Sequence, residues 1–482
     1  MKGELIMKKT ISILLFALTL CGCGKWLDIN DNPNYVKEAK FENLLPAVQL
    51  NTIEKVGYDL ALYGSFWSHY VVQYNNSNQY YTIMTNNVTN STFNSPWSYF
   101  YARILPGVKE IIDGAVASES ANWEFVGKTI LAYDLYMLTS LYDKVAYSEG
   151  FLTESLTPHF DSGEDIQLII IGLLEEVRAM DPDKIDEGEA NRTVIGYDMF
   201  FGGDLDLWRE FANTLYLKVM LRDFNANRSK IQNLLNNSAA DPFLEEDTGI
   251  VNFLDAADKS NPLYESDRRQ LNTAQNIRAC SDVINFLDPS DPRIKYYYEP
   301  IPSGNNAGQY GGAPYGTNGS ASTAGRLRLS ATDPVYISTV DEALFLQAEA
   351  YARLNNPTAA AAAYEDAVVA AFERLGFGSS AATLLAGPYA FTPGTVEENV
   401  EQIINQKWAS NVKSLPIEAW FDINRTGYPA KGAGKILTDY HGILGAEGGY
   451  PVRFIYSKTS ADYNPNSPAP EKVNVKMWWH KQ

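Results

Sequence analysis

The side chains best suited to chemistry in this chain are aromatic and amide groups in two stretches that lack helical periodicity. Residues 73–96 are rich in Asn, Thr and Ser, and residues 299–325 carry many glycines. Aromatic rings stack on apolar ligand faces, and amide side chains both donate and accept hydrogen bonds. Loops of this length in a compact domain are commonly functional. The predicted ligand-binding residues are Tyr80, Tyr81, Asn76, Asn78 and Gln79 in the first stretch, with Tyr310 and Tyr315 in the second.

Motifs for covalent or metal chemistry fail on inspection. Asp28, Asn30 and Asn32 have the spacing of a calcium loop, but Pro33 occupies its glycine position. Residues 376–381 match a dinucleotide fingerprint in letters only, because they follow a predicted helix instead of a strand. The four histidines, His69, His159, His441 and His480, are too scattered for a helical metal pair. The sequence therefore predicts no catalytic residue, no metal site and no cofactor.

Charge and cysteine content narrow the class further. The net charge is −19 and the isoelectric point is near 4.7, which argues against a nucleic-acid partner because phosphates need Lys and Arg. Of three cysteines, only Cys280 lies outside the first 23 residues. An isolated cysteine is usually a small buried apolar group, and we expect that role for Cys280.

The N-terminus has the pattern of a bacterial lipoprotein signal. A basic start is followed by the apolar run from Ile11 to Leu20, which is too short to span a bilayer, and then by Cys21-Gly22-Cys23. We expect residues 1–22 to be a signal peptide and Cys23 to be the lipidated N-terminus. Cleavage before Cys21 fits less well because Leu20 would precede it. An ordinary secretory signal is the alternative.

The elements that must position the two loops are predicted to be helices. Apolar residues recur at helical spacing in several segments, and caps mark their ends. We expect a helical hairpin from Val340 to Leu375, with Asn356 and Pro357 at the start of its second helix and Gly376 after its end. Tyr296, Tyr297 and Tyr298 are expected to alternate sides in a short strand. The other predicted helices are one capped by Asn122, one from Asp165 to Met180, one opened by Asp204, and one from Trp97 to Asp113 with a kink at Pro106.

Several blocks in the chain resemble those of the SusD/RagB family of nutrient-binding outer-membrane lipoproteins. "STVDEALFLQAEAYARLN" resembles the Ala-Glu-Ala helix of that family, and "QKWASNVKSLPIEAWFDINRTGYP" resembles its Gln-Lys-Trp to Arg-Thr-Gly-x-Pro block. "CGKWLDINDNPN", "LYDKVAYSEGF", "GGDLDLWREFANTLYLKVMLRDF", "SDPRIKYYYEP" and "YPVRFIY" fall in the same order as in the second SusD-like subgroup. Within these blocks we expect Trp408, Trp420, Arg425 and Tyr428 to be architectural.

The resemblance implies a mostly α-helical protein. A tetratricopeptide-like helix-pair scaffold would carry long irregular loops and minor β structure in a single domain over residues 23–482. It also implies a lipid-anchored protein on the exterior of the bacterial outer membrane, which binds oligosaccharides and passes them to a SusC-like TonB-dependent transporter without catalysis. Peptide binding in the same transport system is the first alternative. A surface glycan-degrading enzyme and a protein-binding adaptor are the others.

Overall fold

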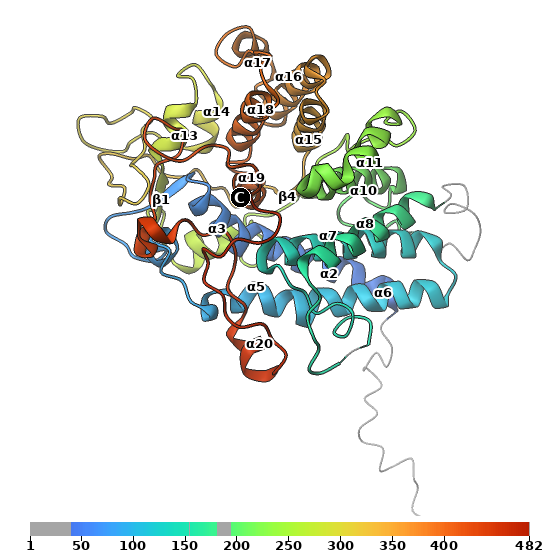
Figure 1. The fold of residues 1–482 in the computed structure, drawn as a ribbon. Helices are drawn as coiled ribbons and strands as arrows, with labels where there is room; N and C mark the ends of the chain where they lie inside the picture. Colours follow the sequence, from blue (N-terminus) through green and yellow to red (C-terminus); the bar gives the residue numbers. More distant parts are fainter. Residues whose placement is uncertain (1–39, 154, 181–193, 482) are drawn as a thin grey trace, which may run out of the picture. The chain divides into compact units, whose positions relative to one another are not determined.

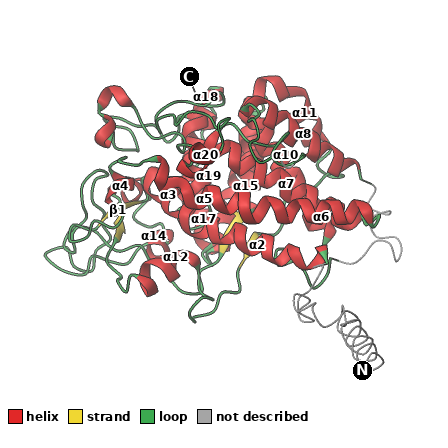
Figure 2. Ribbon diagram, turned by 90° about the horizontal axis from the view of Figure 1, so that it is seen from below, coloured by secondary structure: helices red, strands yellow, loops and turns green. Residues whose placement is uncertain are grey.

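Helices dominate the part of the chain that the structure describes, which is residues 40–153, 155–180 and 194–481 of a computed structural model (Figures 1 and 2). Residues Phe41–Gln482 form one contiguous unit. The longer helices are α2 (Leu44–Lys55), α6 (Leu105–Ala117), α7 (Ala121–Tyr142), α8 (Gly163–Ala179), α10 (Leu205–Met220), α11 (Phe224–Asn236), α15 (Val340–Arg353), α16 (Pro357–Arg374), α18 (Val396–Ser410) and α19 (Pro416–Thr426). The predicted signal peptide, the lipidation site Cys23 and the calcium-like Asp28, Asn30 and Asn32 lie outside the described residues.

Short helical segments connect the long ones. The short α-helices are α3 (Ala61–Trp67), α4 (Tyr81–Met84), α5 (Asn94–Tyr99), α12 (Pro262–Tyr264), α13 (Ser281–Phe286), α14 (Arg293–Tyr297), α17 (Gly378–Leu385) and α20 (Lys458–Tyr463). Three π-helical turns are η2 (Val56–Leu60), η4 (Phe100–Ile104) and η6 (Glu265–Gln270), and the 3₁₀ turns are η1 (Phe41–Asn43), η3 (Asn90–Phe93), η5 (Leu221–Asp223), η7 (Gly442–Leu444) and η8 (Ala446–Gly448).

The β structure consists of two small antiparallel sheets among the described residues. Strands β1 (Val71–Gln73) and β3 (Ile277–Ala279) pair with Val72 opposite Arg278. Strands β2 (Thr248–Ile250) and β4 (Val335–Ser338) pair with Ile250 opposite Val335. The prediction of a mostly α-helical fold with minor β structure is confirmed.

Consecutive helices pack against one another in a series. Helix α6 packs against α7, α7 against α8, and α8 against α10, while α15 contacts α16 and α18. Figure 1 shows α15, α16, α17 and α18 gathered together, apart from α2, α6, α7 and α8. The second hairpin helix begins as predicted, with the Asn356 side chain accepting from the Ala359 N–H, and Gly376 follows its end with φ +78°.

Two predictions about individual helices need correction. The N-cap of α7 is Ser120, so Asn122 lies inside the helix and does not cap it. The segment predicted from Trp97 to Asp113 is one helical run from α5 to α6, and its irregularity is the π-helical turn η4, just before Pro106. Proline lacks an N–H and disturbs the turn that precedes it.

The tyrosine run was predicted as a strand, which is wrong. Tyr296 and Tyr297 end helix α14, and Tyr297 and Tyr298 are both buried. Asp291 accepts a hydrogen bond from the Arg293 N–H at 2.9 Å and thereby starts the helix ahead of the tyrosines. Alternation of the three side chains would require an extended backbone, which this helix start prevents.

A buried set of charged side chains joins α10 with the helices α15, α18 and α19. Lys218 on α10 lies 2.8 Å from Glu342 on α15, and Lys407 on α18 lies 2.8 Å from Asp422 on α19. All four side chains are at most a tenth exposed. Burial alone would lower the pKa of Lys407, but Asp422 and Glu342 outweigh it and raise that pKa above its usual range. These pairs fix the register of four helices, because a buried charge without its partner is costly.

The family-like aromatic and arginine residues are architectural, as predicted for Trp408, Trp420 and Arg425. Both indoles are buried, and each donates its N–H to a backbone carbonyl, Trp408 to Ser68 at 2.9 Å and Trp420 to Pro451 at 3.0 Å. Cys280 is fully buried, as expected.

Candidate ligand-binding face

Three segments distant in sequence meet at one surface of the unit, which we call the loop face: residues 73–86, 310–323 and 431–450. The Gly319 N–H donates to the Gln73 carbonyl at 2.8 Å, and the Asn75 N–H donates to the Gly319 carbonyl at 2.9 Å. The Ile443 N–H donates to the Thr85 carbonyl at 2.9 Å. The structure thus brings both predicted loops together and adds a third segment that the sequence did not indicate.

Two predicted ligand residues lie in the core. Tyr80 is 2% exposed, and its hydroxyl donates to Asp267 at 2.8 Å. Tyr315 is 4% exposed and stacks on His69, with ring centroids 3.7 Å apart. Neither ring offers a face to a ligand, so the prediction that they stack on one is not retained. Their burial has a common reason: each ring fills the space beneath an irregular loop that has no helix face of its own to bury.

The other predicted residues remain at the surface. Tyr81 is 45% exposed, and Asn76, Asn78 and Gln79 are exposed beside it. Tyr310 is partly buried against the core. The Asn76 amide lies 3.4 Å from the Tyr74 hydroxyl, so it is held toward the loop. A tyrosine and three amide side chains therefore share an accessible strip on the first loop.

Tyr440 is a further aromatic residue of the loop face that the sequence analysis missed. It is partly exposed and contacts the Tyr315 ring edge-on, with centroids 5.7 Å apart. Partial burial raises the pKa of the Tyr440 phenol, and the nearby Tyr81 phenol raises it further. The segment that carries Tyr440 contacts the segment that carries Tyr81, because the Ile443 N–H donates to the Thr85 carbonyl at 2.9 Å. No helical or strand periodicity surrounds Tyr440, so only its irregular, glycine-rich context could have marked it.

An open groove of about 820 Å³ lies along the third segment of the loop face. Pro314 lines one side, the segment from Gly432 to Asp439 lines another, and Asp282 lies among its lining residues. The Asp282 carboxylate accepts from His69 Nδ1 at 2.8 Å and from the N–H and hydroxyl of Thr438 at 2.7 Å each. Both carboxylate oxygens of Asp282 are therefore already paired within the protein.

The charge state of this pair follows from burial and hydrogen bonding. Burial lowers the pKa of His69, against the opposing effect of Asp282. Burial alone would raise the pKa of Asp282, but the bonds from His69 and Thr438 hold it below its usual range. Near neutral pH the Asp282 carboxylate at the groove is therefore ionised and fully engaged, and the buried His69 imidazole behind it is neutral.

A clamp of side chains stiffens the third segment. His441 stacks on the Tyr450 ring, with the two ring centroids 4.6 Å apart. The Lys431 ammonium also contacts this ring, with Nζ 3.9 Å from the ring centroid. His441 also contacts the Asp439 carboxylate at 2.9 Å, and Tyr450 donates its hydroxyl to the same carboxylate. Burial lowers the pKa of Lys431 to about 8, although Asp439 opposes the shift. The clamp fixes the loop that carries Tyr440.

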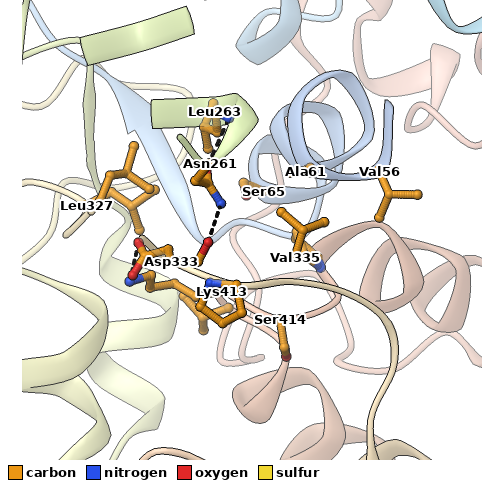
Figure 3. Close-up of a pocket in the computed structure, with 15 residues that line it drawn as sticks. Val56, Ala61, Ser65, Asn261, Leu263, Leu327, Asp333, Val335, Lys413 and Ser414 are labelled. Atoms are coloured by element: carbon orange, nitrogen blue, oxygen red, sulfur yellow. Dashed lines mark hydrogen bonds and ion pairs between the residues drawn. The ribbon is translucent and has the colours of Figure 1, made fainter. Parts of the chain in front are cut away.

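A small internal cavity lies elsewhere, lined by residues of α12, β4, η2 and the segment before α19 (Figure 3). Its volume is about 50 Å³, which is room for water and not for a sugar. Figure 3 shows Lys413 pointing toward Asp333, with 2.9 Å between Nζ and the carboxylate, and Asn261 donating to the Asp333 carbonyl at 3.1 Å. We assign it a structural role.

In the residues that the structure describes, no group of His, Cys, Asp or Glu side chains is arranged to hold a metal ion. Within those same ranges, no helix is both long and apolar enough to cross a bilayer.

Comparison with known proteins gives a consistent result. Residues 33–456 match the family model SusD-like_2, described as "Starch-binding associating with outer membrane". A SusD homologue from Bacteroides uniformis superposes with TM-score 0.73 at 21% identity, over 91% of this chain and 99% of its own. A chitin-binding SusD homologue from Flavobacterium johnsoniae gives TM-score 0.73 at 22% identity, over 91% and 98% of the two chains.

A further structure, described as a chitin-binding protein, gives TM-score 0.74 at 22% identity over 92% of this chain and all of its own. No curated protein matches the chain. The helix-pair scaffold and the family model, which spans most of the sequence, agree with the resemblance seen in the sequence blocks. The chain belongs to the SusD/RagB family, in its second SusD-like subgroup.

Proposed function

We propose that this protein binds glycans at the loop face and passes them, without catalysis, to a SusC-like TonB-dependent transporter. On this proposal it is anchored through lipid on Cys23 and faces the exterior of the bacterial outer membrane. The observation that carries the proposal is the loop face itself: its first segment exposes Tyr81 with the amides of Asn76, Asn78 and Gln79, and its third segment carries Tyr440 and lines an open groove of about 820 Å³.

The chemistry of this face suits a sugar chain. A tyrosine ring supplies a flat apolar surface for the C–H face of a pyranose, and its hydroxyl stays hydrated. The amides of Asn76, Asn78 and Gln79 can each donate to one hydroxyl and accept from another. The groove volume lies within the range of ordinary ligand sites, and it is large enough for a ligand of several sugar rings. Two similar structures carry descriptions of chitin binding, which supports the same class of ligand.

The enzyme alternative needs two carboxyl groups free to act as acid and base. The carboxyl groups that line the groove are Asp282 and Asp439. Asp282 is engaged by His69 and Thr438, and Asp439 is engaged by His441 and Tyr450. The hydrogen bonds to Asp282 hold its pKa below its usual range, which is the opposite of what a general acid needs. This arrangement supports binding over hydrolysis.

Calorimetry with soluble glycans tests the proposal. We expect chitooligosaccharides, maltooligosaccharides or another oligosaccharide of a broad panel to bind, and Tyr81→Ala and Tyr440→Ala each to weaken binding about tenfold, because one stacked ring contributes about 1.4 kcal/mol. Tyr463→Ala is the matched control, because Tyr463 is 80% exposed on α20, outside the loop face.

Saturable binding that survives both loop-face substitutions would place the ligand elsewhere and would contradict the proposed site. Binding of peptides at the loop face, with no response to glycans, would instead favour a peptide carrier in the same transport system.

A further inference from the structure

The clamp closes both ends of the loop that runs from His441 to Tyr450. The His441 ring stacks on the Tyr450 ring, and His441 Nδ1 lies 2.9 Å from the Gly449 carbonyl oxygen. Tyr440 directly precedes His441 in the chain. The contacts of His441 therefore fix the backbone that carries the Tyr440 ring.

Between its ends this loop is loosely packed. Gly445 and Gly449 have φ +68° and +69°, and a Cβ at either residue would meet no atom within 4 Å. The Ile443 side chain, in the turn η7, is 63% exposed. Because a loop with open glycines and an exposed apolar side chain has little packing to hold it, its position depends on the contacts at its ends.

The two contacts of the His441 ring each require a proton on the ring. Nδ1 faces the Gly449 carbonyl oxygen, which can only accept a hydrogen bond. Nε2 lies 2.9 Å from the Asp439 carboxylate, which is also an acceptor. A neutral imidazole has a single N–H and can satisfy one of these acceptors, whereas the imidazolium satisfies both. The clamp is therefore complete only when His441 carries its second proton.

Three groups of the clamp act on the charge of His441. The Asp439 carboxylate and the face of the Tyr450 ring both favour the cation. The Lys431 ammonium opposes it, because its Nζ lies 3.9 Å from the centroid of the same ring. Burial lowers the pKa of Lys431 to about 8, so the loss of its proton above that pH removes a buried charge and stabilises the folded loop. Titration of the lysine and of the histidine thus changes the loop in opposite directions as the pH rises.

The segments that pack against the loop place uncharged groups on it. The Asn86 amide donates to the His441 carbonyl at 3.0 Å, and the Thr85 carbonyl accepts a backbone N–H of the loop at 2.9 Å. The Asn474 amide donates to the Gly448 carbonyl at 2.5 Å. These contacts do not titrate between pH 5 and 8, which is the range over which histidine side chains change charge.

We propose that His441 is a positioning residue of the loop face. As an imidazolium it closes the clamp and holds Tyr440 in place, and as a neutral imidazole it releases one of its two contacts. The closed loop holds a proton that the open loop releases, so its stabilisation is present at acidic pH and is lost as the pH rises through the histidine range. Glycan binding at the loop face then strengthens as the pH falls. This effect on binding rests on the function proposed above, whereas the closing of the loop does not.

Calorimetry with chitohexaose at pH 5.5 and at pH 8 tests the effect on binding. We expect the native protein to bind about tenfold more tightly at pH 5.5, which is the effect of one charge-assisted hydrogen bond. His441→Gln cannot titrate and should bind weakly at both pH values. His441→Arg keeps a planar cation that can donate to both acceptors and stack on Tyr450, so it should bind tightly at both.

His159→Gln is the matched control. His159 also contacts a carboxylate, that of Glu149 at 3.0 Å, but its side chain is 71% exposed and lies outside the loop face. This variant should keep the pH dependence of the native protein. Burial lowers the pKa of both His69 and His480, which favours their neutral forms over this range.

Hydrogen exchange of residues 440–450 without ligand measures the clamp by itself. After correction for the intrinsic exchange rate, we expect the native loop to be more protected at pH 5.5 than at pH 8, and the His441→Arg loop to be equally protected at both. Equal protection of the native loop at the two pH values overturns the proposal.

The two measurements together separate the clamp from the glycan function. Native binding that is equally tight at both pH values, or a pH dependence that persists in His441→Gln, overturns the positioning role even if the loop responds to pH. If the loop responds but chitohexaose does not bind at either pH, the clamp stands and the function proposed for the loop face fails for this glycan.

Discussion

Gly316 shows how a single residue controls the shape of the loop face. Its φ is +84°, and a Cβ built there would lie 2.2 Å from the Tyr440 ring. Any side chain at this position must therefore push the ring away, in addition to straining the backbone. The position of the Tyr440 ring at the loop face depends on the absence of that one carbon atom.

We predict that Gly316→Ala displaces Tyr440, weakens ligand binding and lowers the free energy of unfolding by about 1–3 kcal/mol. Urea unfolding followed by fluorescence, with calorimetric binding in parallel, measures both effects. Gly308→Ala is the control, because Gly308 has φ +86° in the same region but no atom within 4 Å of its built Cβ. Equal losses in the two variants would show that backbone strain alone matters and that the Tyr440 contact does not.

At the scale of elements, α15 and α19 are joined by one buried bidentate ion pair. Arg425 donates to the two carboxylate oxygens of Glu349 at 2.5 and 2.7 Å, and Arg353 donates to the same carboxylate at 2.7 Å. Burial alone would raise the pKa of Glu349, but Arg425 and Arg353 outweigh it and lower that pKa to about 2. Arg425 also donates to the Asp422 carboxylate at 2.7 Å, so its architectural role rests on carboxylates of two helices.

We predict that Arg425→Ala lowers the free energy of unfolding by about 3–5 kcal/mol, because it leaves Glu349 buried with a single cation. Because the folded-state pKa lies below the unfolded value, the stabilisation from Glu349 is present above the unfolded value and is lost as pH falls toward 2. Chemical unfolding from pH 2 to 7 measures both. Lys458→Ala is the control, since that exposed lysine pairs with Asp462 and should cost under about 1 kcal/mol. A loss no larger than the control's would refute the claim that this pair holds the two helices.

An element could be predicted from the sequence when the residues that determine it are close together in the chain. The helix opened by Asp204 begins where expected, because the Asp204 side chain accepts from the second and third N–H groups and its neighbours carry the apolar period. The candidate site was harder to predict. Tyr80 and Tyr81 are adjacent in sequence, yet Tyr80 is buried while Tyr81 is exposed. The Tyr80 hydroxyl donates to Asp267, a residue 187 positions away in the chain. Tyr440 joins the site only through contacts across the fold.

At the scale of the whole molecule, stability depends on the ionisable side chains that the fold buries without a hydrogen-bond or ionic partner. Asp134, in the middle of α7, is fully buried, and neither of its carboxyl oxygens has a hydrogen-bond partner among the described residues. Burial raises the pKa of Asp134 well above its usual range. The folded protein therefore keeps this proton at a pH where the unfolded chain has released it, so stability falls as pH rises from the unfolded value of about 3.9 toward the folded value.

We predict that Asp134→Asn removes this fall, because the amide has nearly the same shape and does not titrate. Each unit of difference between the folded and unfolded pKa corresponds to about 1.4 kcal/mol, so the variant should gain stability over the native protein steadily as pH rises above about 4. Urea unfolding at a series of pH values measures the difference, with exposed Asp462→Asn as the control. Parallel stability curves for the native protein and Asp134→Asn would mean that the Asp134 carboxyl is solvated or paired in solution. A diverging pair of curves would show that the fold buries the neutral Asp134 carboxyl at a measurable cost, whereas the buried Glu349 carboxylate is stabilised by Arg425 and Arg353.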